Sequence, residues 1–219
     1  WLLVEKPERT VWSGFFPLRY TGAVAIFVGM AFVAPLLAGL LVPAALAGTA
    51  DRPARRRIRA VGVAAGIPLL LLLLLSLPES LPRGLAAAGI TLSVSLLAGG
   101  LHLLLESLRA SPSAAQTAAS LVAPALIASL FVLGPGIPES GDGAAISSRI
   151  TWLLALNPYS VLAYAVFDTD LLTLRVFYSN HLAGYPYGVP RLIPGMLFLA
   201  LPGLALAGAA FLIRRGRRT

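Results

Sequence analysis

The 219-residue chain contains no cysteine and only two histidines, His102 and His181. The absence of cysteine excludes disulfides, thiolate nucleophiles and cysteine-ligated metal sites. Two histidines argue against a multi-histidine metal centre or a bis-histidine haem within this chain. A phosphate-binding loop is also absent from the sequence, so ATP hydrolysis would need a partner chain. We therefore expect a protein that is not an enzyme and has no resident metal or other cofactor.

Charged residues are scarce as well. They make up 12% of the chain, against about 25% in a typical soluble domain. Apolar residues make up 58%, and they gather in runs long enough to cross a bilayer. The net charge of +8 comes from two short arginine clusters. A nucleic-acid surface would instead need a basic face with aromatic or polar readers. This pattern predicts an all-α integral membrane protein that binds no nucleic acid.

The first arginine cluster, residues 51–59 (DRPARRRIR), lies between two apolar runs, and the second, residues 214–219 (RRGRRT), ends the chain. Short loops rich in Lys and Arg remain on the cytoplasmic side of a membrane. We therefore predict that both clusters face the cytoplasm at the inner membrane, where they set the topology and meet lipid headgroups. The residues concerned are Arg52, Arg55, Arg56, Arg57, Arg59, Arg214, Arg215, Arg217 and Arg218.

The apolar pattern predicts five transmembrane helices, because about 20 helical residues cross 30 Å of hydrocarbon. The expected spans are 21–46, 60–77, 85–105, 113–133 and 192–213. The small residues of the third span, among them Gly89, Gly99 and Gly100, are expected to let helices approach closely. The chain then divides into an interfacial N-terminal segment (1–20), four spans (21–133), an extracytoplasmic loop with short helices (134–191), and the last span with its basic tail (192–219).

A further apolar stretch, residues 150–167, is interrupted at Asn157-Pro158. If it also crossed the membrane, the two arginine clusters would lie on opposite sides. We therefore predict an interfacial helix pair or a re-entrant hairpin, which must lie at the surface or against protein. The resulting topology has the N-terminus outside and the C-terminus inside.

Two phrases carry a family resemblance. They are SPSAAQTAASLVAPALI (residues 111–127) and LLALNPYSVLAYAVFD (residues 153–168), followed by a terminal span that ends in arginines. Over the last ~110 residues the chain resembles the second half of the membrane permease of type-two ATP-binding-cassette exporters. The resemblance implies that the five spans match the second to sixth spans of that family and that the first lies upstream of Trp1. It also implies other transmembrane subunits, a cytoplasmic ATPase partner, an amphipathic or lipid-like substrate, and an extracytoplasmic gate region with Asn157, Pro158, Tyr159 and Asp168.

His102 supports a different interpretation of the chain. It closely follows two glycines, Gly99 and Gly100, in the phrase GGLHLLLE, and such a histidine could ligate the metal of a porphyrin or chlorin. The favoured interpretation of His102 is a hydrogen bond to a neighbouring helix or to Glu106. The alternative function is therefore a structural or accessory transmembrane subunit of a larger respiratory or photosynthetic complex.

Overall fold

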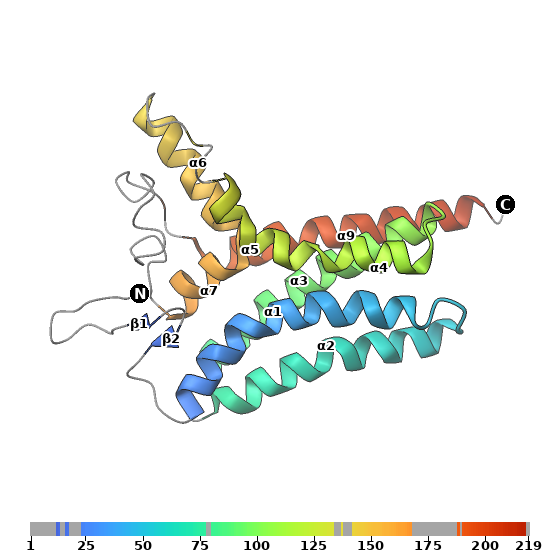
Figure 1. Cartoon of the computed structure of the whole chain (residues 1–219), viewed down its shortest axis with the longest axis horizontal. Helices are drawn as coiled ribbons and strands as arrows, with labels where there is room; N and C mark the ends of the chain where they lie inside the picture. Colours follow the sequence, from blue (N-terminus) through green and yellow to red (C-terminus); the bar gives the residue numbers. More distant parts are fainter. Residues whose placement is uncertain are drawn as a thin grey trace, which may run out of the picture.

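The structure is a computed structural model that describes residues 12–13, 16–17, 23–77, 80–133, 137, 142–167, 188 and 190–217. Four long helices lie side by side in a bundle (Figure 1). These are α1 (Ala23–Ala47), α2 (Ala54–Ser76), α3 (Leu81–Ser107) and α9 (Leu192–Gly216). All four are long and apolar enough to cross a membrane. They confirm the helices predicted from the first, second, third and fifth apolar runs.

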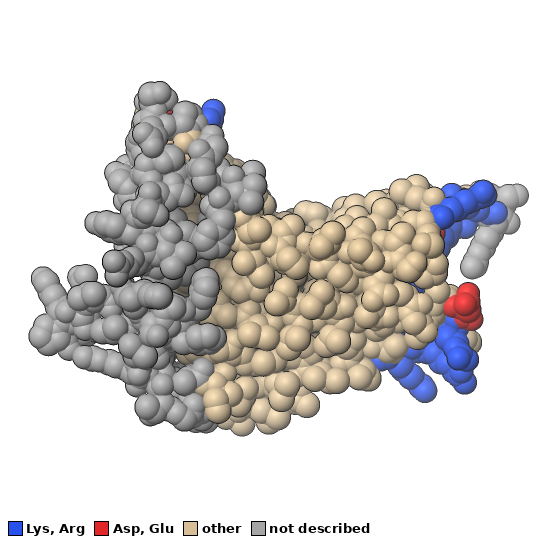
Figure 2. Space-filling view, in the orientation of Figure 1, with Lys and Arg blue, Asp and Glu red and all other residues tan. Residues whose placement is uncertain are grey.

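Most of the charged residues that the structure describes gather at one end of this bundle, whereas Arg83, Asp142, Arg149 and Arg191 lie elsewhere. Figure 2 shows basic side chains at that end, and a surface without charged side chains along the body of the bundle. The connection between α1 and α2 and the C-terminal end of α9 both lie there (Figure 1). The two arginine clusters therefore lie at the same end of the bundle, as the loop pattern predicts. We call this region the arginine end.

The fourth predicted span is divided in the structure. Residues 113–133 were expected to form one helix, but they form α4 (Pro112–Ser120) and α5 (Val122–Leu133), which meet at Leu121. Pro124 explains the break, because it has no N–H for the Ser120 carbonyl and its ring crowds that oxygen. As a result α4 follows the bundle, whereas α5 turns away from it (Figure 1).

The predicted interruption at Asn157-Pro158 is confirmed. Helix α6 (Gly143–Leu156) ends there and α7 (Pro158–Phe167) begins, with a bend of 88° between them. Taken together, this pair is apolar enough to be a broken span or a re-entrant loop. Helix α7 packs against α1, α3, α5 and α9. It is therefore built into the bundle at the end far from the arginines.

Near the N-terminus, Trp12–Ser13 (β1) and Phe16–Pro17 (β2) form a two-residue antiparallel ladder. The sequence predicts only an interfacial segment over residues 1–20, so this short ladder is an addition to the all-helical expectation. It contacts the bundle through α1.

The main core lies between α1, α3, α6 and α7, with one contribution from α2. Its largest fully buried members are Phe27, Leu72, Ile90, Ile150, Leu154 and Leu162, each with an exposed fraction of 0%. Burial of side chains of this size against neighbouring helices is a packing contribution, since lipid itself is apolar. In contrast, only 17% of the apolar window of α2, and of α9, is buried inside the structure. These two helices present most of their apolar surface outward.

Glycines allow α3 and α9 to approach closely. A Cβ added to Gly100 of α3 would fall on the carbonyl oxygen of Gly203 in α9. A Cβ added to Gly203 would in turn lie 2.5 Å from the Leu96 carbonyl carbon. Likewise, Gly89 lies directly beside Met196. These contacts confirm the prediction that small residues in the third span permit close helix packing.

Candidate functional site

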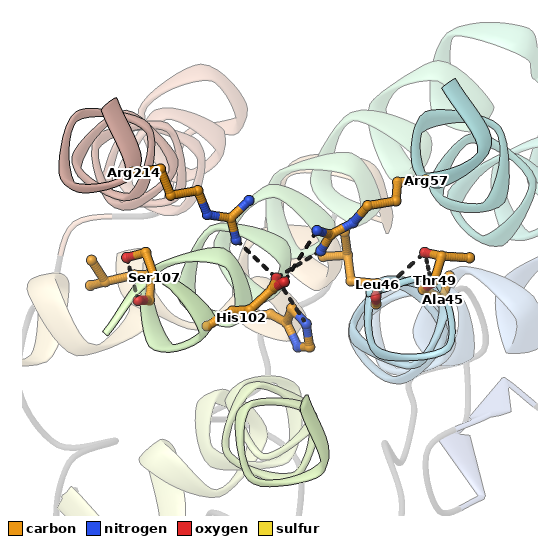
Figure 3. A network of polar contacts seen from close by, with 9 residues as sticks. Ala45, Leu46, Thr49, Arg57, His102, Ser107 and Arg214 are labelled. Atoms are coloured by element: carbon orange, nitrogen blue, oxygen red, sulfur yellow. Dashed lines mark hydrogen bonds and ion pairs between the residues drawn. The ribbon is translucent and has the colours of Figure 1, made fainter. Parts of the chain in front are cut away.

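At the arginine end, one carboxylate joins three helices. Glu106, near the C-terminus of α3, accepts two hydrogen bonds from Arg57 of α2, with Nη1–Oε1 at 3.1 Å and Nη2–Oε2 at 2.7 Å. The Nη2 atom of Arg214, in the last turn of α9, lies 2.9 Å from the same Oε2 as an ion pair. Figure 3 shows both guanidinium groups pointing at the carboxylate from opposite sides. The Arg57 contact is the bidentate fork that makes arginine–carboxylate pairs strong and directional.

This cluster is largely removed from solvent. The side chains of Arg57 and Glu106 are 14% and 18% exposed, and that of Arg214 is 37% exposed. A charged group in such a position is stable only when it is paired and hydrogen-bonded. Arg217 adds a further tie, because its Nη1 donates to the Ser107 carbonyl at 2.6 Å. That oxygen belongs to the last turn of α3, where carbonyls lack a partner within the helix.

The remaining arginines of the two clusters behave differently. Arg52, Arg55, Arg56, Arg59 and Arg215 are exposed, and none of them forms a salt bridge or side-chain hydrogen bond with a described residue. Arg218 lies outside the described residues. The structure therefore separates arginines that hold helices together from arginines that face outward, a distinction that the sequence pattern does not make.

His102 lies inside the bundle with an exposed fraction of 0%. Its Nε2 is 3.9 Å from Glu106 Oε2, which is too long for a hydrogen bond. Neither ring nitrogen has a hydrogen-bond partner among the described residues. The expected hydrogen bond of His102, to a neighbouring helix or to Glu106, is thus not formed with any described residue.

The space beside the two glycines near His102 is filled by neighbouring helices. A Cβ on Gly99 would lie 3.2 Å from Val42 of α1, and Gly100 meets Gly203 of α9. These glycines therefore serve the contacts of α3 with its neighbours. Among the described residues, no group of three or more His, Asp or Glu side chains could hold a metal ion. A role of His102 as a pigment ligand stays a prediction.

At the other end, Asn157 occupies the break between α6 and α7. Its side chain is fully buried, and its Oδ1 accepts from the backbone N–H groups of Tyr159 and Ser160 at 2.9 and 3.1 Å. Asn157 is therefore the N-cap of α7, and Pro158 takes the first helical position, where its missing N–H is not needed. The Asn-Pro phrase thus starts a new helix as well as ending the previous one.

The amide nitrogen of Asn157 also binds a second helix. It donates to the Leu126 carbonyl of α5 at 2.5 Å and lies 3.2 Å from Ser129 Oγ. One neutral side chain thus satisfies the start of α7 and fixes α7 to α5. The contact between Ser129 and Asn157 shows that a polar residue of α5 bonds outside its own helix.

Tyr159, the next residue of the phrase, packs against aromatic rings. It stacks on Phe32 of α1, with ring centroids 6.0 Å apart and an interplanar angle of 21°. Phe32 also stacks on Phe167 at the end of α7, at 5.7 Å. The Tyr159 hydroxyl and the Ser160 hydroxyl are both buried without a hydrogen-bond partner among the described residues. The aromatic contacts fix both ends of α7 against α1.

The structure thus places three of the four predicted gate residues together at one turn. Asn157, Pro158 and Tyr159 form the start of α7, whereas Asp168 lies outside the described residues. Sequence reasoning did not find Glu106 as the centre of the arginine cluster. Its signal was present, because Glu106 is the acidic residue nearest the C-terminal end of the third apolar run, which the predicted topology places on the same side as the arginine clusters.

Comparison of the chain with protein-family models, with curated proteins and with solved structures finds no match. The function must therefore be argued from the two regions described above.

Proposed function

We propose that this chain is a non-catalytic, permease-type subunit of an ATP-binding-cassette transporter in the inner membrane. Its substrate is amphipathic or lipid-like, and a partner chain supplies the ATPase. Further transmembrane chains complete the transport path, and the N-terminal side of the bundle faces outward.

The observation that carries the proposal is the position of α7. This helix follows a break of 88°, and it contacts α1, α3, α5 and α9. The contacts at its start are the neutral hydrogen bonds of Asn157 and the aromatic stack of Tyr159 on Phe32. A helix that touches so many neighbours can transmit a change in bundle packing to the end far from the arginines. Transport by alternate access requires a movable element of this kind.

The arginine end is where the ATPase partner would bind. Residues 48–53 between α1 and α2 contain no helix or strand, and exposed arginines lie within this segment (Arg52) and directly after it (Arg55, Arg56). Because Glu106 holds α2, α3 and α9 together there, a partner that moves the α1–α2 turn would move these three helices as one unit. The positive charge of the exposed arginines at this end favours an acidic surface on the partner.

Purification of the native chain in a mild detergent, with mass spectrometry of its partners, tests the proposal. We expect an ATP-binding-cassette ATPase in the complex and ATP turnover that rises when the permease subunit is present. The variant Asn157→Ala should lower stimulated turnover without removing the ATPase, whereas Ser93→Ala, whose hydroxyl bonds only to its own helix, should not. A purified complex without an ATPase would refute the proposal.

A second candidate function rests on His102. Because its two ring nitrogens are buried without a partner, a structural subunit of a respiratory or photosynthetic complex remains the alternative. An absorbance spectrum of the same preparation separates the two functions. A pigment or haem band that disappears in His102→Leu, together with electron-transfer subunits and no ATPase, would favour the accessory role.

A further inference from the structure

The outward arginines of α2 form a stripe that continues into its apolar surface. Arg55 and Arg59 are one turn apart, and Gly62 and Gly66 follow at spacings of three and four residues. Residues at these spacings lie on the same face of an α-helix. The stripe ends at Leu70, which is 58% exposed. Along this flank of α2, from its N-terminus, two arginine side chains are followed by two glycines without side chains and then by an exposed leucine.

The two arginines of this stripe are free to bind a ligand. Both are exposed, and neither forms a hydrogen bond or ion pair with a described residue. Glu106, the buried acid at this end, is already bound by Arg57 and Arg214. The positive charge of Arg55 and Arg59 is therefore not balanced within the described residues.

The two glycines of the stripe, Gly62 and Gly66, are not in contact with a neighbouring helix. A Cβ added at Gly62 or Gly66 would meet nothing within 4 Å, whereas the glycines of α3 and Gly203 of α9 lie directly against neighbouring groups. Gly62 and Gly66 therefore do not serve contacts inside the bundle. They leave a side-chain-free surface directly below the arginines on the apolar part of the helix.

We infer that this flank of α2 binds one anionic diacyl phospholipid, with its phosphate on Arg55 and Arg59 and an acyl chain along Gly62, Gly66 and Leu70. The dimensions agree, because 1.5 Å per residue places Leu70 about 16 Å from Arg59 along the helix. That is about half of a 30 Å hydrocarbon core, which is the depth of one leaflet. The charge selects an anionic headgroup, since juxtamembrane arginines attract anionic lipid at the membrane surface.

This lipid would be a fixed component of the protein and not its transported substrate. It requires only that the bundle lies in a bilayer, so it does not depend on the proposed ATPase partner. Its role would be to hold the start of α2 at the membrane surface, while Arg57 on the opposite flank holds α2 to α3.

Native mass spectrometry of the delipidated chain, titrated with phosphatidylglycerol or phosphatidylcholine, tests this inference. We expect one phosphatidylglycerol to bind with higher affinity than phosphatidylcholine. Arg55→Gln and Arg59→Gln should each weaken phosphatidylglycerol binding about five-fold, because each arginine near the surface contributes a comparable attraction. The matched control is Arg215→Gln, which removes the same charge from the exposed end of α9 and should leave the affinity unchanged.

The glycine part of the site has its own control. Gly62→Leu with Gly66→Leu should weaken phosphatidylglycerol binding, whereas Gly208→Leu, at an equally open position on α9, should not. Glycerol phosphate should compete poorly, because it lacks acyl chains. Equal losses in Arg55→Gln and Arg215→Gln would overturn the inference in favour of a diffuse surface charge. Equal affinity for the two lipids, or full competition by glycerol phosphate, would also overturn it.

Discussion

The two ends of the bundle are held together by different kinds of interaction. At the arginine end, Glu106 binds Arg57 and Arg214 through charge, and the three residues come from three helices. At the opposite end, Asn157 binds α5 and caps α7 through neutral hydrogen bonds, and aromatic rings complete the contact. The charged residues Arg57, Glu106 and Arg214 are partly exposed, whereas Asn157 is fully buried.

The largest effect is expected where α3 and α9 cross between the two ends. In Gly203→Ala the new Cβ would meet the Leu96 backbone, so the helices must separate, and we expect a loss of about 3 kcal/mol of unfolding free energy. Unfolding in mixed micelles, followed by circular dichroism, measures the loss. The control Gly208→Ala has open space at the same helix and should be neutral or slightly stabilising. Similar values for the two variants would contradict the close crossing.

The ion pairs of Glu106 with Arg57 and Arg214 are tested by Glu106→Gln. This change keeps the shape but leaves two guanidinium groups without a counter-charge, and we expect a loss of about 2 kcal/mol of unfolding free energy. Because partly buried ion pairs are screened to some degree, the difference between variant and wild type should shrink at high salt. The same unfolding assay checks it at two salt concentrations. Asp51→Asn, at an exposed acid of the same end, should change little, and an equal loss there would contradict the special position of Glu106.

The neutral hydrogen bonds of the Asn157 side chain are tested by Asn157→Ala. Removal of the N-cap and of the bond to α5 should lower the unfolding free energy by about 1 to 2 kcal/mol. This loss should not depend on salt, since no charge is involved. Hydrogen exchange should increase at the backbone amides of Tyr159 and Ser160, which lose their acceptor. A salt-dependent loss, or unchanged exchange at these amides, would contradict the capping role.

The smallest effect is expected for Ser129→Ala. The Ser129 hydroxyl is one of several groups around the Asn157 amide nitrogen, so its removal leaves a partner in place. We expect a loss of about 0.6 kcal/mol, the average for a hydrogen bond between membrane helices. Measured with Asn157→Ala in a double-mutant cycle, the two changes should not be additive. Additive losses would mean that Ser129 and Asn157 do not interact.

The long helices could be predicted because apolar runs of this length have few alternatives to membrane spans. The break at Asn157-Pro158 could also be predicted, since proline interrupts the preceding helix. Its capping role was within reach of the sequence too, because Asn followed by Pro is a typical helix start. The break at Leu121 could not be predicted from Pro124 alone, because Pro35 and Pro43 lie inside the unbroken helix α1.

The partners of the charged residues could not be predicted. Glu106 is separated from Arg57 by 49 residues in the sequence, and it meets Arg214 only because Gly100 and Gly203 bring α3 and α9 together. Which arginines bind inward and which remain exposed depends on this packing. The loop pattern identifies the cluster and its common side, but it treats all of its arginines as equivalent.

The placement of the two arginine clusters on one side of a membrane is the central claim, and cysteine labelling tests it most directly. Because the chain has no cysteine, single substitutions can be read without background. Arg56→Cys, Arg215→Cys and Ala144→Cys place a thiol at exposed positions, the first two at the arginine end and the third at the start of α6. In sealed vesicles of one orientation, a membrane-impermeant maleimide should label Cys variants at 56 and 215 together, and the variant at 144 only from the other side. Labelling of positions 56 and 215 from opposite sides would contradict the account.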